Sequence, residues 1–383
     1  MNSTGYLDHA ATSFPKAPGV PEAVASLLSD AAGNPGRGGH GLVRTATRIV
    51  ESTRDALAQL LGAEAERLVF GPGATFWLNT LLSSVLARGD RVVVSALEHN
   101  AVMRPLRHLE RERGLEVVVI SGACGDGVPS AHEVVDQVTR ARTRAVVLTH
   151  ASNVSGAVLP IAEIVRAVPG TPVIVDGAQT AGSIPVDFRQ LGAAAYVCSG
   201  HKGLLGPAGV GLLMFAEGFQ VEPLVRGGTG SRSQSEEMPR AFPDRLEAGT
   251  PNTAGIAGLG AAVRWLAQEG VETIHRRTTR LVERLAEGLS MLPGIRLVGY
   301  DATQPRVGTL SFCCRGMDLG ELVTWLDREH GLMLRGGLHC APAAHRQLGT
   351  FPSGTLRASV GPFSSEGAVD ALVEALAVAK EVL

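Results

Sequence analysis

The sequence has few cysteines and no long apolar run, and each shortage excludes a kind of protein. The five cysteines are odd in number and show no C-x-x-C spacing, so neither a disulfide framework nor a zinc site is expected. No apolar run is long enough to span a bilayer. The first residues lack the basic start and apolar core of a signal peptide. Together these absences predict a cytoplasmic protein with reduced thiols and no metal site.

The sequence also lacks a concentration of charge of one sign. The formal net charge is −2 over 383 residues, and lysine and arginine are spread along the chain. Proteins that bind nucleic acid or an anionic membrane gather their basic residues into a patch. We therefore expect neither nucleic acid nor a membrane among the partners. The hydrophobic fraction of 45% is ample for a large core.

What is present is a regular alternation between about residues 67 and 215. Short apolar runs alternate there with amphipathic stretches, which predicts a largely parallel sheet covered by helices on both faces. The runs at 196–198 and 210–214 are separated by a loop too short for a helical crossover, so this pair is expected to be antiparallel. The earlier predicted strands are residues 67–70, 91–94, 115–120, 145–148 and 173–175.

The remainder of the chain has a different character. A polar, glycine-rich stretch at 226–237 ends the alternation and predicts a long loop. Beyond about residue 254, long helical patterns precede an α+β region with strands expected at 307–313 and 355–359. We therefore predict an N-terminal arm at 1–20, a large domain at 21–254 and a smaller C-terminal α+β domain at 255–383.

Two motifs that follow predicted strands carry the chemistry. Asp176-Gly-Ala-Gln179 follows one apolar run and Ser199-Gly-His-Lys202 follows the next. The carboxyl ends of strands in an open α/β sheet converge on one crevice, so the motifs bring an amine and a carboxylate together. Pyridoxal phosphate needs this set: a lysine for a Schiff base, a carboxylate for the pyridinium nitrogen, and donors for the phenolic oxygen and the phosphate.

The strength of the carboxylate interaction supports this interpretation. At ~3 Å and an effective dielectric of ~20, a carboxylate attracts a pyridinium by roughly 5 kcal/mol before desolvation costs. That attraction keeps the ring protonated at neutral pH. Lys202 alone would be read as a surface-loop lysine and Asp176 alone as a turn former, but together they predict a pyridoxal-phosphate enzyme.

Other residues have expected contacts with this cofactor. The Gly71–Thr75 loop lies between a strand and a helix, where the backbone amides of Ala74 and Thr75 favour a phosphate. His99 follows another strand and is expected to stack on the ring, although a lone histidine there is more often merely hydrogen-bonded. Ser199 and His201 are further candidates for the phosphate, and Asn153 and Gln179 for the phenolic oxygen.

These motifs resemble the class V aminotransferase superfamily, and within it the cysteine desulfurase branch. The resemblance implies an α/β fold of the type I pyridoxal-phosphate-dependent transferase class. It also implies a homodimer with active sites at the subunit interface and a small amino acid as substrate. Besides the two motifs, the matching segments are 7–12, 34–40, 98–99, 152–153, 245–252, 335–340 and 356–359.

The resemblance assigns further roles. Thr250 stands where such enzymes reach across to the phosphate of the partner subunit, and Arg357 matches the arginine that holds the substrate α-carboxylate. Cys340 stands where desulfurases carry the nucleophile that receives sulfur as a persulfide; the alternative for a free cysteine is a small buried hydrophobe. Asn153, His339 and Arg37 are the other expected substrate contacts.

The implied reaction converts L-cysteine to L-alanine, with Lys202, Cys340 and His99 as catalytic residues and a sulfur-acceptor protein as a further partner. Two departures from well-studied members leave alternatives open: Leu338 replaces a second polar residue, and residues 359–363 lack a tyrosine-asparagine pair. The first alternative is a C–S lyase that eliminates a thiolate from a cysteine conjugate. An aminotransferase or an epimerase would leave Cys340 without a role. A non-catalytic scaffold would not need both Lys202 and Asp176.

Overall fold

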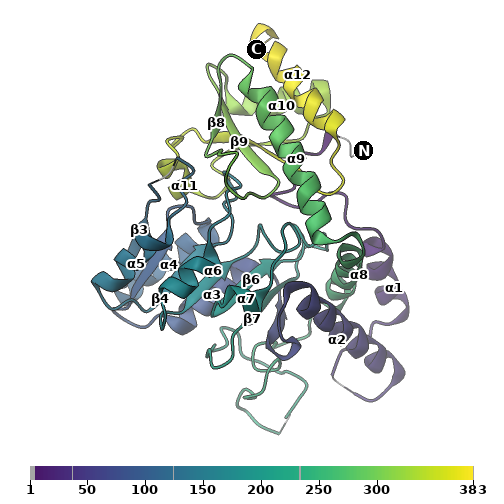
Figure 1. Ribbon diagram of the computed structural model, residues 1–383. Coiled ribbons are helices and arrows are strands. Elements are labelled where there is room, and N and C mark those ends of the chain that lie inside the picture. Colours follow the sequence, from purple (N-terminus) through teal and green to yellow (C-terminus); the bar gives the residue numbers. More distant parts are fainter. Residues whose placement is uncertain (1–4, 37, 124, 233, 383) are drawn as a thin grey trace.

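Two sheets organise the molecule. The computed structural model describes residues 5–36, 38–123, 125–232 and 234–382. A seven-stranded sheet lies in the lower half of Figure 1 and a four-stranded sheet in the upper half, with the long helix α9 (Val271–Ser290) running up the side of the smaller one. No helix of the described part of the chain is both long and apolar enough to cross a membrane.

The larger sheet is mostly parallel. Its order is β1-β7-β6-β5-β4-β2-β3, and only β7 runs antiparallel to its two neighbours. Both the parallel sheet and the antiparallel pair predicted from the short Lys202 loop are therefore confirmed. The strands are β1 (Leu68–Gly71), β2 (Arg91–Ser95), β3 (Glu116–Ile120), β4 (Ala145–Thr149), β5 (Val173–Asp176), β6 (Ala195–Ser199) and β7 (Gly211–Phe215).

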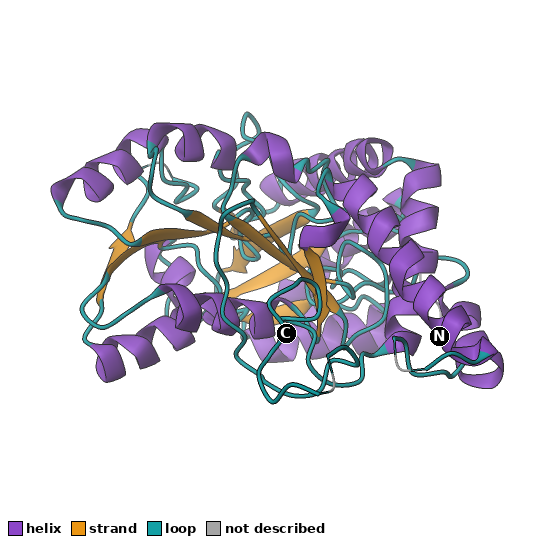
Figure 2. Cartoon of the chain, turned by 90° about the horizontal axis from the view of Figure 1, so that it is seen from below, coloured by secondary structure: helices purple, strands orange, loops and turns teal. Residues whose placement is uncertain are grey.

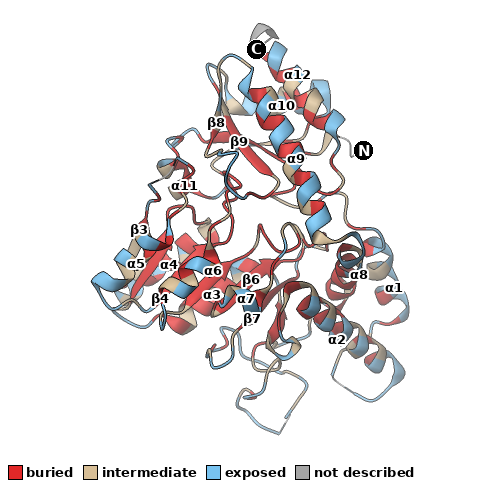
Figure 3. Cartoon of the chain, viewed as in Figure 1, coloured by how far each residue is buried: buried red, intermediate tan, exposed pale blue. Residues whose placement is uncertain are grey.

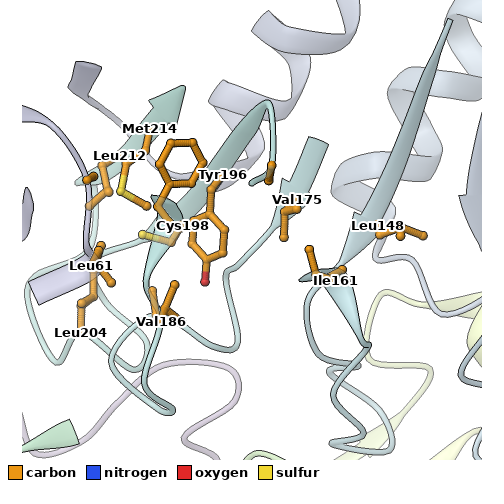
Figure 4. Packing of buried hydrophobic residues seen from close by; sticks show 14 of the residues in the cluster. Leu61, Leu148, Ile161, Val175, Val186, Tyr196, Cys198, Leu204, Leu212 and Met214 are labelled. Carbon is orange, nitrogen blue, oxygen red and sulfur yellow. The ribbon is translucent and has the colours of Figure 1, made fainter. Parts of the chain in front are cut away.

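Apolar side chains on both faces of this sheet explain why helices cover both. Along β2, Val93 belongs to one hydrophobic cluster, whereas Val92 and Val94 belong to another. Figure 2 shows helices above and below the strands, and Figure 3 shows the central strands buried throughout. Figure 4 shows the first cluster, where Tyr196 and Cys198 of β6 pack together. The covering helices are α3 (Ala74–Val85), α4 (Asn100–Arg113), α5 (Ala131–Arg140), α6 (Ile161–Ala167) and α7 (Phe188–Leu191).

Three helices form a group beside the large sheet. The helices α1 (Val20–Asp30) and α2 (Gly41–Leu61) pack against α8 (Thr253–Glu269). The sequence analysis assigned no element to α1 or α2. The boundary near residue 254 falls in the first turn of α8, and the division into an arm and two domains stays a prediction.

The smaller sheet is antiparallel, with the order β10-β11-β9-β8. Its strands are β8 (Ile295–Val298), β9 (Thr309–Cys314), β10 (Arg335–Gly337) and β11 (Thr355–Ser359), so the two strands predicted in this region are present. Its helices are α9, α10 (Leu319–His330), α11 (Pro342–Gln347) and α12 (Glu366–Val382).

The N-terminal segment adds to this smaller sheet. Tyr6 forms a parallel bridge with Met333, and Asp8 forms one with Ser359 at the end of β11. Leu7 between them is fully buried in the core of the smaller sheet. This pairing brings Asp8 beside β11, more than 340 residues later in the chain.

Gly177, directly after Asp176, makes a first prediction possible. A Cβ at position 177 would collide with the ring of Tyr196, which is fully buried and shares a hydrogen bond of 2.7 Å with Thr180. The fully buried ring cannot move away from the added methyl group. We expect Gly177→Ala to lower the free energy of unfolding by about 1–3 kcal/mol, the usual cost of overpacking a core. Urea unfolding of both proteins measures this change in free energy.

Gly39→Ala is the matched control, because a Cβ at position 39 would meet nothing within 4 Å. An equal, small change in both variants would contradict the assigned collision.

Candidate active site

Lys202 and Asp176 lie at neighbouring strand ends. Asp176 is the last residue of β5, and Lys202 follows the end of β6 by three residues. The loop is tight, since the Leu205 amide donates to the Lys202 carbonyl at 2.8 Å and the Gly206 amide to the Gly200 carbonyl at 2.8 Å. Burial lowers the pKa of Lys202, and the Asp176 carboxylate acts in the opposite direction. The amine and the carboxylate are thus close enough to interact.

Asp176 is a buried carboxylate with one backbone donor. Its Oδ1 accepts a hydrogen bond of 3.0 Å from the Ala178 amide, and its side chain is almost fully buried. Burial raises the pKa of Asp176, and the Lys202 ammonium lowers it. A carboxylate in this position gains from a positive group placed opposite it.

Glu98 is a second buried carboxyl, to which the sequence analysis gave no role. Its Oε1 accepts from Ser95 Oγ at 2.5 Å and from the Thr149 amide at 2.8 Å, whereas its Oε2 is buried without a hydrogen-bond partner. The pKa of Glu98 is raised to about 8, mainly by burial and also by the Asp176 charge. Glu98 is therefore mostly protonated at neutral pH, which leaves Asp176 as the negative charge.

The start of α3 is open to an anion. Its N-cap residue, Gly73, provides no side-chain cap, and Ser199 Oγ accepts a hydrogen bond of 3.1 Å from the Ala74 amide. Thr75 follows and is exposed. Unpaired amides at a helix start and the helix dipole both favour a phosphate.

His99 caps the next helix on the same edge. Its Nδ1 accepts a hydrogen bond of 3.0 Å from the Ala101 amide at the start of α4, so its hydrogen is on Nε2. Burial, followed by the positive charges of Lys202 and Arg335, lowers the pKa of His99 to about 4. The ring is neutral at neutral pH, which suits stacking on an aromatic cation.

The remaining residues expected to contact the cofactor are hydrogen-bonded to other parts of the chain. Gln179 Nε2 donates to the Ala10 carbonyl at 3.0 Å, and Asn153 Nδ2 donates to the His339 carbonyl at 2.7 Å. The imidazole of His201 shares a hydrogen bond of 3.0 Å between its Nδ1 and Thr12 Oγ1. Burial lowers the pKa of His201 to about 4.

Arg357 is almost fully buried on β11 and is already partly neutralised. Its Nη2 donates to Asp8 Oδ1 at 2.7 Å, and its Nη1 donates to the Asn153 carbonyl at 3.0 Å. Its Nε is buried and has no hydrogen-bond partner among the described residues. The sequence analysis missed the ion pair with Asp8, because the two residues are 349 positions apart.

Cys340 is an exposed thiol in an unusual backbone conformation. Both His339 (φ 48°) and Cys340 (φ 57°) are left-handed, which is uncommon for residues with a Cβ. The Asn100 amide donates to the Cys340 carbonyl at 2.8 Å. Arg335 Nη2 lies 4.0 Å from Cys340 Sγ, a contact that the sequence spacing alone did not establish.

The other residues of interest lie apart from this group or outside the described residues. Cys198, Cys313 and Cys314 lie on strands, with Cys198 and Cys314 buried. Thr250 is exposed and lines a separate cavity of about 430 Å³ with Gly71 and Pro72. Arg37 and Cys124 lie outside the described residues.

Comparison with known proteins identifies the family. The family model for aminotransferase class-V matches residues 5–372. The chain belongs to the class-V aminotransferase family. A probable cysteine desulfurase of Methanothermobacter thermautotrophicus is 35% identical to this chain over 379 residues. The match covers 97% of this chain and 93% of the relative. The cysteine desulfurase CsdA of Escherichia coli is 33% identical, over 99% of this chain and 94% of the relative.

Two solved structures of cysteine desulfurases superpose closely on this chain. An apo cysteine desulfurase from Thermococcus onnurineus NA1 superposes with a TM-score of 0.93 at 30% identity, covering 100% of this chain and 96% of the other. A structure of CsdA from Escherichia coli, in an S-sulfonic acid form, gives a TM-score of 0.87 at 32% identity, covering 100% and 96%. The type I pyridoxal-phosphate fold expected from the sequence is confirmed.

Pyridoxal phosphate is the cofactor of this family. The residues present fit it: a buried carboxylate that interacts with the Lys202 charge, a neutral imidazole, and a helix start whose N-cap, Gly73, has no side chain. Lys202 would supply the amine, and burial keeps its pKa below the usual value. The same edge of the large sheet thus offers a group for each end of the cofactor.

Neutral histidines around this edge predict an acid-sensitive fold. His150, whose amide donates to the Asp176 carbonyl, is buried, and burial lowers its pKa from 6.5 to about 4. Between these values the unfolded chain binds a proton that the folded chain does not. The contribution of the neutral His150 ring to the free energy of unfolding is thus present above about pH 6.5 and is lost as the pH falls through about 4.

We expect His150→Phe to reduce the difference in unfolding free energy between about pH 7 and about pH 4.5 by about 2 kcal/mol. Urea unfolding at a series of pH values measures this difference, and the exposed His132→Phe on α5 is the control for loss of an imidazole. An unchanged pH dependence in the His150 variant would show that this ring is not buried in its neutral form.

Proposed function

We propose that this protein is a cysteine desulfurase, which converts L-cysteine to L-alanine and holds the sulfur on Cys340 as a persulfide. The observation that carries the proposal is the exposed Cys340 thiol beside Arg335, in electrostatic contact with Lys202. A transaminase or an epimerase has no use for a thiol in this position. The names of the relatives support the same reaction.

Arg357 binds the substrate carboxylate in this proposal. A guanidinium offers a rigid fork of donors that matches a carboxylate, and Arg357 Nε is buried without a partner. Asp8 holds the guanidinium from the other side through Nη2. Asn153, His339 and Arg37 are the further substrate contacts we propose, with Asn153 Nδ2 fixing the His339 carbonyl.

Lys202 moves the proton of the reaction. Its amine, with a pKa lowered by burial, removes the α-proton of the bound cysteine. Pyridoxal phosphate, when bound, supplies an electron-poor ring that stabilises negative charge at the substrate Cα. In this proposal Asp176 would pair with the ring nitrogen and His99 would stack on the ring. Ala74, Thr75, Ser199 and His201 would hold the phosphate, and Asn153 and Gln179 would contact the phenolic oxygen.

Cys340 then takes the sulfur. Its thiolate attacks the substrate sulfur, so that an S–S bond forms while the Cβ–S bond of the substrate breaks. The electron pair of the broken bond stays on the carbon, which takes up a proton. Cysteine and the Cys340 thiol become alanine and a Cys340 persulfide, and no external oxidant is needed because the carbon is reduced as the sulfur is oxidised.

Two partners complete the proposal. A homodimer would place the exposed Thr250 at the phosphate of the partner subunit. A sulfur-acceptor protein would remove the outer sulfur from Cys340 and restore the thiol for the next turnover.

Replacing Cys340 tests the proposal. With L-cysteine and dithiothreitol, we expect Cys340→Ser to reduce alanine formation to the protein-free blank, because a hydroxyl cannot accept sulfur in this way. The visible absorbance of bound cofactor should remain, since Cys340 does not hold it. Cys313→Ser, which removes a half-buried thiol on β9, is the matched control and should retain alanine formation.

The products separate this reaction from the C–S lyase alternative. Alanine, pyruvate and sulfide are measured together with L-cysteine and with S-substituted cysteines. Alanine formation that persists in Cys340→Ser, or pyruvate as the main product of the wild-type protein, would refute the desulfurase assignment.

A further inference from the structure

A groove beside Cys340 is lined by arginine. It lies between α4 and α11, which are neighbours on the left of Figure 1, and has a volume of about 620 Å³. Arg104, Arg107 and Arg111 of α4 and Arg346 of α11 line it, and none of the described residues that line it is an aspartate or a glutamate. This concentration of positive charge occurs in a chain whose net charge is −2.

Two of these arginines lack an acidic partner. Arg107 forms an ion pair of 2.9 Å with Glu110, and Arg346 lies over the ring of Phe351. Arg104 and Arg111 are exposed, and neither forms an ion pair with a described residue. Their free guanidinium groups remain available to a ligand with negative charge.

The groove adjoins the loop that carries Cys340. Asn100 lines it, and the Asn100 amide donates to the Cys340 carbonyl at 2.8 Å. Pro342, two residues after Cys340, lines it as well. A ligand bound in the groove therefore lies beside the backbone of the residue that receives the sulfur.

The spacing of the arginines fits a chain of carboxylates better than one small anion. Arg104 and Arg111 are seven residues apart on α4, about two helical turns and about 10 Å along the axis. An extended peptide covers that distance with about three residues. A single carboxylate or phosphate spans only a part of it.

We propose that this arginine groove binds an acidic segment of the sulfur-acceptor protein, with carboxylates flanking the accepting thiol. The inference rests on the proposed desulfurase function. Opposite charges on the two surfaces speed their encounter and fix their register. The groove then selects the acceptor, whereas the Lys202 cleft selects the amino acid.

The transfer step is balanced without a further reagent. The acceptor thiolate attacks the outer sulfur of the Cys340 persulfide, forming a new S–S bond. The bond between that sulfur and Cys340 Sγ breaks, and Cys340 leaves as a thiolate. The proton lost by the acceptor thiol ends on Cys340, so a persulfide and a thiol exchange places.

Synthetic peptides test the inference on the cofactor-loaded enzyme. The peptides Glu-Glu-Gly-Cys-Gly-Glu-Glu and Lys-Lys-Gly-Cys-Gly-Lys-Lys serve as acceptors with L-cysteine as donor, and mass spectrometry measures peptide persulfide. We expect the acidic peptide to react with a kcat/KM at least about tenfold higher at low salt, and this preference to shrink as salt screens the charges. In Arg104→Glu/Arg111→Glu the preference should be lost or reversed.

Two controls keep the outcomes distinct. Dithiothreitol-supported alanine formation gives the basal rate of every variant, and Arg280→Glu/Arg315→Glu changes two exposed arginines that do not line the groove. No alanine with dithiothreitol would overturn the proposed function itself. With a normal basal rate, equal reaction of both peptides, or an acidic preference that survives Arg104→Glu/Arg111→Glu, would overturn the groove alone.

Mercaptosuccinate separates a small anionic thiol from a protein segment. We expect it to react more slowly than the acidic peptide and to be less sensitive to Arg104→Glu/Arg111→Glu. If mercaptosuccinate matches the peptide in both respects, the acceptor is a small molecule and the inference is wrong.

Discussion

The attraction between a buried amine and a buried carboxylate at one edge of the large sheet is the interaction on which the site depends. Burial alone would neutralise both groups, because it lowers the pKa of Lys202 and raises that of Asp176. Each group opposes that effect on the other. Glu98, protonated by its own burial, removes a competing negative charge. The pairing of β5 with β6 fixes the two strand ends, so the chemistry follows from the sheet order.

A second constraint joins the two sheets. Asn153 and Asn100, which follow strands of the large sheet, hold the Cys340 segment, while the N-terminal segment brings Asp8 to Arg357. Lys202 therefore follows a strand of the large sheet, whereas Arg357 lies on a strand of the small one; Figure 1 shows the two sheets one above the other. The substrate, bound by both, would lie at their junction, with the thiol and its arginine groove on one side.

Local patterns predicted the large sheet well and the site contacts less well. Apolar runs located the strands, and the short loop around Lys202 was enough to predict an antiparallel pair, since loop length limits the connection. The ion pair of Asp8 with Arg357 depends on the fold of the whole chain and has no local signal. Arg104 and Arg111 have the spacing of an ordinary solvated helix face, so only the position of α11 reveals the groove. The left-handed backbone at Cys340 could not be predicted either, because that position carries a cysteine and not the glycine that usually marks this conformation.

The chain contains three lysines, Lys16, Lys202 and Lys380, which makes the central claim directly measurable. Reduction of the cofactor-loaded protein with borohydride, followed by digestion and mass spectrometry, locates the covalently attached pyridoxyl group. The account predicts one adduct, on the peptide that contains Lys202. An adduct on Lys16, whose half-buried amine donates to the His201 carbonyl at 3.1 Å, or no reducible adduct at all, would contradict it.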